Sequence, residues 1–285
     1  MKQDSTADNV KRGAEQAVKQ TLANPWVERL ARFGYAAKGA VYCVIGVLAV
    51  MAAFGAGGGL TDSRGAMQTI LAQSFGKVLL GIVAVGLIGY ALWRFVQAGI
   101  DAENKGTSAK GIAVRIGYAI SGLIHCGLAL TAAKLVFGAG GEGGGNGSQD
   151  WTAQVLAQDY GRWLVGAVGA IIVGVGVSQF YKAYSAKFRD KLNGGEMSAA
   201  EQRWATRSGK LGFAARGLVF VLIGFFIVQA AWTYDASKVQ GVGGALAALA
   251  GGPFGWLVLF IVATGLVAYG VFMFVQARYR RISTE

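Results

Sequence analysis

The sequence has very few of the residues on which enzymes usually rely. Its 285 residues include one histidine, two cysteines and two prolines, and only 15% of them are charged. The usual catalytic patterns are missing: there is no HExxH, no GxSxG, no phosphate-loop lysine and no CxxC pair. We therefore expect a protein that is not an enzyme and that holds no cofactor.

The few metal-binding residue types also count against a metal site. His125 is the only histidine, and Cys126 beside it has its counterpart in Cys43. One imidazole and two thiols fall short of the four ligands of a closed zinc site, so we expect no metal. We expect two small buried thiols instead, without a disulfide, because both cysteines lie toward the reducing, cytoplasmic side.

Acidic residues are missing from six long apolar segments. A membrane-spanning helix needs about 20 apolar residues, and each segment reaches that length. The chain is 54% hydrophobic and has 45 glycines, which suits closely packed membrane helices. We therefore predict an all-α membrane protein with six transmembrane helices. They lie near residues 34–54, 77–97, 116–137, 162–182, 212–233 and 255–276.

The basic residues are distributed unequally between the two sides of these segments. The net charge is +12, and 22 of the 27 basic residues fall on the side that also carries both termini. This positive-inside pattern predicts a multi-pass protein of the bacterial inner (plasma) membrane with cytoplasmic N- and C-termini. The excess charge would face the bilayer and its anionic phospholipid headgroups, so we expect no nucleic-acid partner. Residues 1–29 are expected to form a cytoplasmic polar tail and the start of an interfacial helix, and because the first twenty-odd residues are polar and charged we expect no cleavable signal peptide.

A short motif opens every second apolar segment. "RFGYAAKG" at 32 recurs as "RIGYAISG" at 115 and "KLGFAARG" at 210. The shared pattern is a basic residue, an apolar residue, Gly, an aromatic residue, Ala, any residue, Lys/Ser/Arg, and Gly. The two glycines of each copy are expected to let helices pack closely. They are Gly34, Gly39, Gly117, Gly122, Gly212 and Gly217.

The alternate segments repeat as well, so the chain is three helical hairpins. "GKVLLGIVAVGLIGYALWRFVQA" from Gly76 aligns with the segments that start at Gly161 and Gly255. We place repeat one at 30–106, repeat two at 107–194, and repeat three with its basic C-terminal tail at 195–285. Each hairpin begins and ends on the cytoplasmic side, so the repeats are parallel. A pseudo-threefold bundle is the simplest arrangement, and a row of hairpins is the alternative.

The repeated motif resembles that of a bacterial family of integral membrane proteins of unknown function. That family is built from three copies of a two-helix domain, each marked by Gly-Tyr-x-x-Lys-Gly. The resemblance covers about 30–282, and Ser121 and Phe213 depart from the motif. It implies six membrane helices and supplies no established activity.

Each linker on the outer side ends in a semi-apolar piece. These pieces are "AMQTILAQSFG", "WTAQVLAQDYG" and "ALAALAGGPFG", with Leu71, Leu156 and Leu249 in nearly equivalent places. We predict short helices that lie on, or dip into, the outer face, with re-entrant pore helices as the alternative.

The main candidate site follows from residues spaced four apart on the first helix of each repeat. Such residues share one stripe of a helix. If these stripes face inward, two cations, a serine, a tyrosine and a histidine converge on the cytoplasmic half without a carboxylate in the spans. Gln97, Lys182 and Gln276 leave the membrane at similar depth. The candidate anion- or ligand-binding residues are thus Lys38, Tyr42, Ser121, His125, Arg216, Gln97, Lys182 and Gln276.

Two interpretations of this pattern stay open. Lys38 and Arg216 either bind an anion or a lipid phosphate, or extend to the headgroups as interfacial side chains commonly do. Arg94 is a further interfacial cation, with Asp101 and Glu103 as potential partners. The leading functional hypothesis is a channel-like or binding protein for a small anionic or lipidic ligand. The alternative is a structural or accessory subunit that packs on other membrane proteins or self-associates.

Overall fold

The computed structural model describes residues 25–103, 105–139 and 147–282. Within these ranges six helices are long and apolar enough to cross a membrane, which confirms the predicted six spans. They are α2 (Pro25–Ala53), α4 (Gly76–Gly99), α5 (Ala109–Val136), α7 (Gly161–Ser185), α8 (Ala199–Thr233) and α10 (Gly255–Tyr279). The described residues contain no strand beyond one isolated bridge between Leu192 and Arg280. The predicted polar tail lies outside the described residues up to position 24.

Local signals explain where the helices begin. α2 starts at Pro25, whose fixed φ suits a first helical position. Ser108 caps α5 by accepting from the Gly111 amide at 3.2 Å. α8 begins 13 residues before the predicted apolar segment, because Ser198 and Glu201 form a reciprocal capping box that starts the helix in polar sequence.

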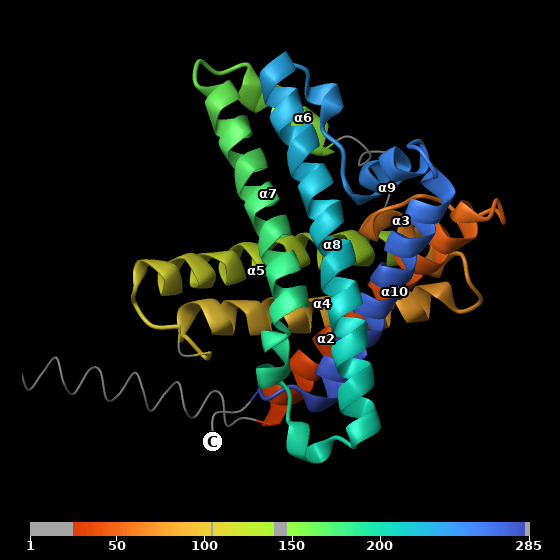
Figure 1. Cartoon of the computed structure of the whole chain (residues 1–285), viewed down its shortest axis with the longest axis vertical. Coiled ribbons are helices and arrows are strands. Elements are labelled where there is room, and N and C mark those ends of the chain that lie inside the picture. Colours follow the sequence, from red (N-terminus) through yellow and green to blue (C-terminus); the bar gives the residue numbers. More distant parts are fainter. Residues whose placement is uncertain (1–24, 104, 140–146, 283–285) are drawn as a thin grey trace, which may run out of the picture.

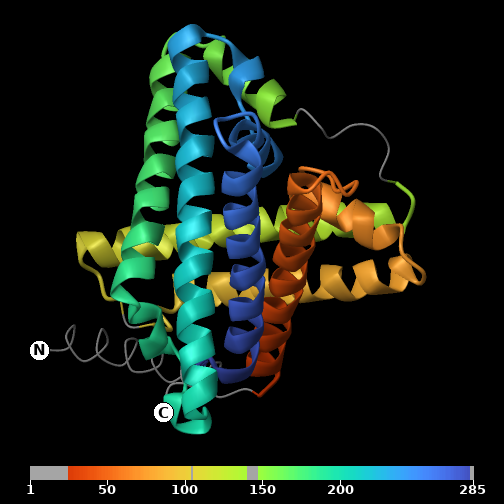
Figure 2. The same ribbon diagram turned by 45° about the vertical axis from the view of Figure 1, so that its right-hand side comes forward.

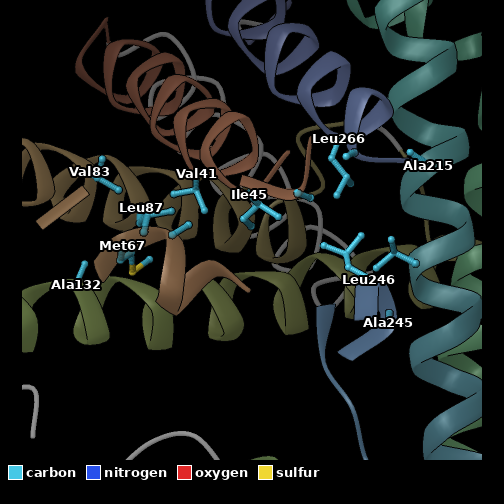
Figure 3. Packing of buried hydrophobic residues seen from close by; sticks show 14 of the residues in the cluster. Val41, Ile45, Met67, Val83, Leu87, Ala132, Ala215, Ala245, Leu246 and Leu266 are labelled. Carbon is cyan, nitrogen blue, oxygen red and sulfur yellow. The ribbon is translucent and has the colours of Figure 1, made fainter. Parts of the chain in front are cut away.

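The three predicted short helices are present between the long ones. They are α3 (Ser63–Leu71), α6 (Gly147–Leu156) and α9 (Val242–Ala250). Met67 of α3 and Leu246 of α9 are fully buried, whereas α6 buries no residue. Figure 3 shows Met67 beside Leu87 of α4 and Ala132 of α5. Two of the short helices therefore insert into the core, and α6 stays on the surface.

The long helices pack in series instead of closing into the predicted pseudo-threefold bundle. Along the series the order is α5, α4, α2, α10, α8, α7. Figures 1 and 2 show α4 and α5 running across α7 and α8, with α2 and α10 between the two pairs. α5 and α7, the two helices of repeat two, cross without packing along each other. The arrangement is a threefold ring that is open within repeat two.

One interface of this ring is formed three times. The first helix of each repeat packs on the second helix of the preceding repeat, and repeat one completes the cycle by packing on repeat three. At each contact the second motif glycine lies against a phenylalanine ring at an equivalent position. The pairs are Gly39 with Phe274, Gly122 with Phe95, and Gly217 with Phe180. The second motif glycine therefore serves contacts between repeats.

In repeats one and two, the basic residue that opens the motif serves the same interface. Arg32 Nη1 donates to the carbonyl of Ala277 at 3.0 Å, near the end of α10. Arg115 Nε donates to the carbonyl of Ala98 at 2.8 Å, near the end of α4. These carbonyls lack partners within their own helices, and a cation stabilises the negative end of a helix.

The other interface joins the two helices within a hairpin, and it forms only in repeats one and three. The first motif glycine lies at this interface, where there is no room for a side chain. A methyl group on Gly34 would lie 2.6 Å from Cα of Tyr90, and one on Gly212 would lie 2.5 Å from Cα of Tyr269. Gly117, the equivalent glycine of repeat two, has nothing within 4 Å of that position. Repeat two therefore lacks the hairpin contact of its neighbours.

Two isoleucines account for the open hairpin. In repeat one, Ala37 of α2 contacts Gly86 of α4, and both residues are small enough for close approach. The corresponding pair in repeat three is Ala215 and Gly265. Repeat two has Ile120 and Ile171 at these positions, and both side chains are exposed. Two branched side chains keep the helix axes too far apart for the contact used elsewhere.

The two kinds of glycine environment predict opposite results for one substitution. Gly34→Ala should lower the free energy of unfolding by about 1–3 kcal/mol, because the new methyl group meets backbone atoms of Tyr90 that cannot move aside. Gly117→Ala should leave stability unchanged or slightly raised, since the site is open and alanine favours helix. Denaturant unfolding in mixed micelles measures both. Equal losses in the two variants would contradict the open hairpin.

Candidate functional site

The helix ends that carry the basic excess are called the basic end below. They are the first residues of α2, α5 and α8 and the last residues of α4, α7 and α10. Lys38, two turns from the motif arginine in α2, is only 5% exposed. Its Nζ donates to the Tyr90 hydroxyl of α4 at 2.9 Å and lies 4.4 Å from the centre of that ring. The side chain is turned into the protein, not outward to a headgroup plane.

Repeat three builds the same pair with arginine. Arg216 Nη1 donates to the Tyr269 hydroxyl at 2.6 Å, and its Cζ lies 4.3 Å from the ring centre. Tyr90 and Tyr269 occupy equivalent positions of α4 and α10. Repeat two has Ser121 for the cation and Val175 for the tyrosine. Cation and phenol are thus present together in two repeats and absent together in the third. This co-occurrence is visible in the aligned repeats and could have identified Tyr90 and Tyr269 as partners of the two cations.

Four of the five predicted stripe residues meet around these tyrosines. The Tyr42 ring packs edge-on against Tyr269 at 4.8 Å, and Arg216 lies 5.4 Å from the centre of Tyr42. The His125 ring lies 4.5 Å from Tyr90, and its Nδ1 is 2.7 Å from the backbone oxygen of Ser121. Ser121 contributes this carbonyl, and its hydroxyl makes no hydrogen bond within the described residues.

Arg94 of α4 joins the cluster and extends it. Its Nε donates to the Tyr90 hydroxyl at 2.9 Å, and its Nη1 donates to Gln97 Oε1 at 2.9 Å. The Tyr90 oxygen therefore receives hydrogen bonds from two cations, Lys38 and Arg94. Of the two acids predicted as partners of Arg94, Asp101 accepts from backbone amides of its own loop instead.

Two of the three predicted residues at the helix exits belong to the network. Gln97 is fully buried and donates to Glu103 Oε1 at 2.6 Å. Gln276 accepts from Arg280 Nη1 at 2.5 Å. Lys182, the equivalent residue of repeat two, is exposed and makes no hydrogen bond or ion pair with the described residues.

Glu103, in the loop after α4, holds this network together. Its carboxylate pairs with Arg280 and Lys191, each at 2.5 Å, and accepts from the Tyr118 hydroxyl at 2.7 Å. Burial by itself would raise the pKa of the carboxyl, but the charges of Arg280 and Lys191 outweigh it and hold that pKa well below its usual range. Burial, together with the Arg280 charge, lowers the pKa of Lys191 to about 8.

The three cations deeper in the protein have only neutral partners. Lys38, Arg94 and Arg216 contact phenols and an amide, and none of them forms an ion pair with a described residue. The Arg216 Nε is buried and has no hydrogen-bond partner in the described part of the chain. We call these three residues, with Tyr42, Tyr90, His125 and Tyr269, the cation–tyrosine cluster. It carries three positive charges that the described residues leave uncompensated.

The thiols differ from their prediction in one respect. Both cysteines are free, and Cys43 is half-buried at the contact of α2 with Gly270 of α10. Cys126 is exposed, contrary to the expected burial, because it lies on a face of α5 that α4 does not cover. The described residues contain no group of three potential metal ligands among His, Cys, Asp and Glu.

Comparison with known proteins confirms the resemblance seen in the motif. Residues 33–101, 116–186 and 211–280 each match the family described as Domain of Unknown Function (DUF1206). The chain belongs to this family. It is also 38% identical over 261 residues to the uncharacterized protein YxxB of Bacillus subtilis (strain 168), covering 92% of this chain and 94% of that protein. No solved structure matches the chain.

Glu103→Gln should be strongly destabilising, because it leaves the buried cation Arg280 without a carboxylate and also removes the partner of the more exposed Lys191. We expect a loss on the order of 3–5 kcal/mol in the free energy of unfolding. Glu28→Gln, which breaks the more exposed pair with Arg32, should cost less than about 1 kcal/mol. Equal effects of the two substitutions would contradict the central position of Glu103.

The stability of the protein in acid should also depend on the Glu103 carboxylate. Because the folded-state pKa of Glu103 lies below its unfolded value, its contribution is complete above about pH 4.3 and is lost as pH falls toward the folded-state pKa. Unfolding measured between pH 6 and pH 3 should therefore show a steeper acid destabilisation in the wild type than in Glu103→Gln. Parallel curves would argue against this pKa shift.

Proposed function

We propose that this multi-pass membrane protein binds a small anion, or the anionic headgroup of a lipid, at the cation–tyrosine cluster. The basic end would face the cytoplasm, with both termini there, because 22 of the 27 basic residues lie on that side. The membrane would be the bacterial inner membrane. The observation that carries the proposal is a set of three cations, the buried Lys38 and the half-buried Arg94 and Arg216, none of which has a carboxylate partner among the described residues.

The energetics of buried charge support an anionic ligand. A cation removed from water is costly unless a counter-charge or several hydrogen bonds replace its hydration. Lys38 has three N–H donors and one hydrogen-bond partner, the Tyr90 hydroxyl. The carboxylate of Glu103 is already shared by Arg280, Lys191 and Tyr118. An anion beside Lys38 and Arg216 would supply the missing charge and acceptors.

The chemistry of the cluster supports binding in preference to catalysis. Its cations and hydroxyls are donors, and it has no carboxylate to serve as a general base. His125 Nδ1 is engaged by a backbone oxygen, which leaves Nε2 as the ring's remaining polar atom. We therefore propose a non-enzymatic role in binding or passage of the ligand.

Inorganic phosphate, titrated calorimetrically into the protein in phosphatidylcholine nanodiscs, tests this proposal. Lys38→Met and Arg216→Met should each weaken binding at least tenfold, since each removes a cation of the cluster. Lys110→Met is the matched control, because Lys110 is an exposed cation at the same end of the protein that makes no hydrogen bond or ion pair with a described residue. Native mass spectrometry of the same variants should show loss of co-purified phosphatidylglycerol if the ligand is a lipid. Unchanged retention of both ligands in Lys38→Met would exclude the proposal.

One observation favours an accessory role as a second candidate. Ile120 of α5 and Ile171 of α7 expose apolar side chains on faces that are covered in the other repeats. A helix of another membrane protein, or of a second copy, could pack there. A photo-crosslinker at Ile120 in native membranes should then give one discrete protein adduct that a crosslinker at Val78, an exposed apolar position of α4, does not give. Lipid adducts alone at both positions would exclude it.

A further inference from the structure

A second basic cavity lies at the basic end, separate from the cation–tyrosine cluster. Its volume is about 550 Å³, a size typical of small-ligand sites. The wall is formed by the last turns of α4, the loop that follows it, the 3₁₀ helix η1 (Lys187–Lys191) and the residues after α10. Its charged residues are Glu103, Lys105, Lys187, Asp190, Lys191, Arg280 and Arg281. None of the residues predicted from the motif lines it.

Five of these side chains are basic and two are acidic, and their pairing leaves positive charge in excess. Glu103 is taken by Arg280 and Lys191, with Lys105 at 3.6 Å. Lys187 and Arg281 form no ion pair with a described residue. Asp190, the second acid of the wall, forms none either, so the five basic residues of the cavity outnumber its two acids.

Trp93 is an independent observation that favours a ligand with hydrogen-bond acceptors in this cavity. The side chain lines the cavity, and the residue is 3% exposed. Its indole N–H is buried and has no hydrogen-bond partner in the described residues. Buried donors are almost always paired, so an unpaired one beside a cavity calls for an acceptor. Repeat three has Phe272 at this position, so packing of the helix does not require the N–H.

We propose that this cavity binds a phosphate group, carried by a phospholipid headgroup or by a small soluble phosphate compound. A phosphate presents several strong acceptor oxygens and a negative charge, which suits one neutral donor and two exposed cations without an ion-pair partner among the described residues. Ala102 and Ile282 add apolar wall for the carbon part of such a ligand. The proposal stands on residues outside the cation–tyrosine cluster and does not depend on the function proposed above.

The test compares two double variants that remove the same charge from the same end of the protein. In the full chain in phosphatidylcholine nanodiscs, Lys187→Gln with Arg281→Gln should weaken at least tenfold the binding of inorganic phosphate that is followed through the Trp93 indole signal, which reports this cavity alone. Arg203→Gln with Arg207→Gln, two exposed cations of α8 outside the cavity, should not. Lys38→Met separates the two sites, because it should spare the phosphate bound in this cavity.

The Trp93 indole provides a direct readout. Its N–H signal in a nuclear magnetic resonance spectrum, assigned by its loss in Trp93→Phe, should shift on addition of phosphate to the wild type. If phosphatidylglycerol alone shifts the signal, and its retention in native mass spectrometry falls in the Lys187/Arg281 variant, the source is a lipid headgroup. An indole signal that moves with neither probe, or equal weakening in the two double variants, would overturn the proposal.

Discussion

The carboxylate of Glu103 is the interaction on which the arrangement of the basic end depends. It comes from repeat one and contacts Tyr118 and Lys191 of repeat two and Arg280 of repeat three. Repulsion among basic residues would otherwise drive these elements apart, since the same end carries most of the positive charge of the chain. One partly buried acid therefore joins all three repeats at the end where basic residues are most concentrated.

The interface between successive repeats is formed three times, whereas the interface between the two helices of a hairpin is formed only in repeats one and three. The second motif glycine serves contacts between repeats in all three copies, as does the basic residue in repeats one and two, and the first glycine serves the contact within a hairpin. Ile120 and Ile171 replace small residues in the second contact only, so repeat two keeps its neighbours and loses its own hairpin. A change at two positions converts a closed ring into an open series without altering the helices themselves.

Two basic regions follow from this architecture at different depths. The cation–tyrosine cluster lies within the packed helices, where phenols take the place of carboxylates as partners of Lys38 and Arg216. The second basic cavity includes Glu103 in its wall and lies among the segments that connect the helices. Gln97 and Arg94 link the two by hydrogen bonds, so Glu103 orders both regions from one position.

The sequence by itself determined the six spans, the three repeats and the short helices between them, because hydrophobic length and internal repetition are local properties of the chain. It also identified the slot that holds Lys38, Ser121 or Arg216, since alignment of the copies exposes it. Only the tertiary structure decided that Tyr90 and Tyr269 are the partners of those cations, that Glu103 pairs with Arg280, and that repeat two is open. Each of these depends on contacts between residues far apart in the chain, and on whether two helices approach closely enough to touch. How closely two helices approach depends on the volume of the side chains at the point where they cross. The periodic pattern of hydrophobic residues in the sequence does not contain this information.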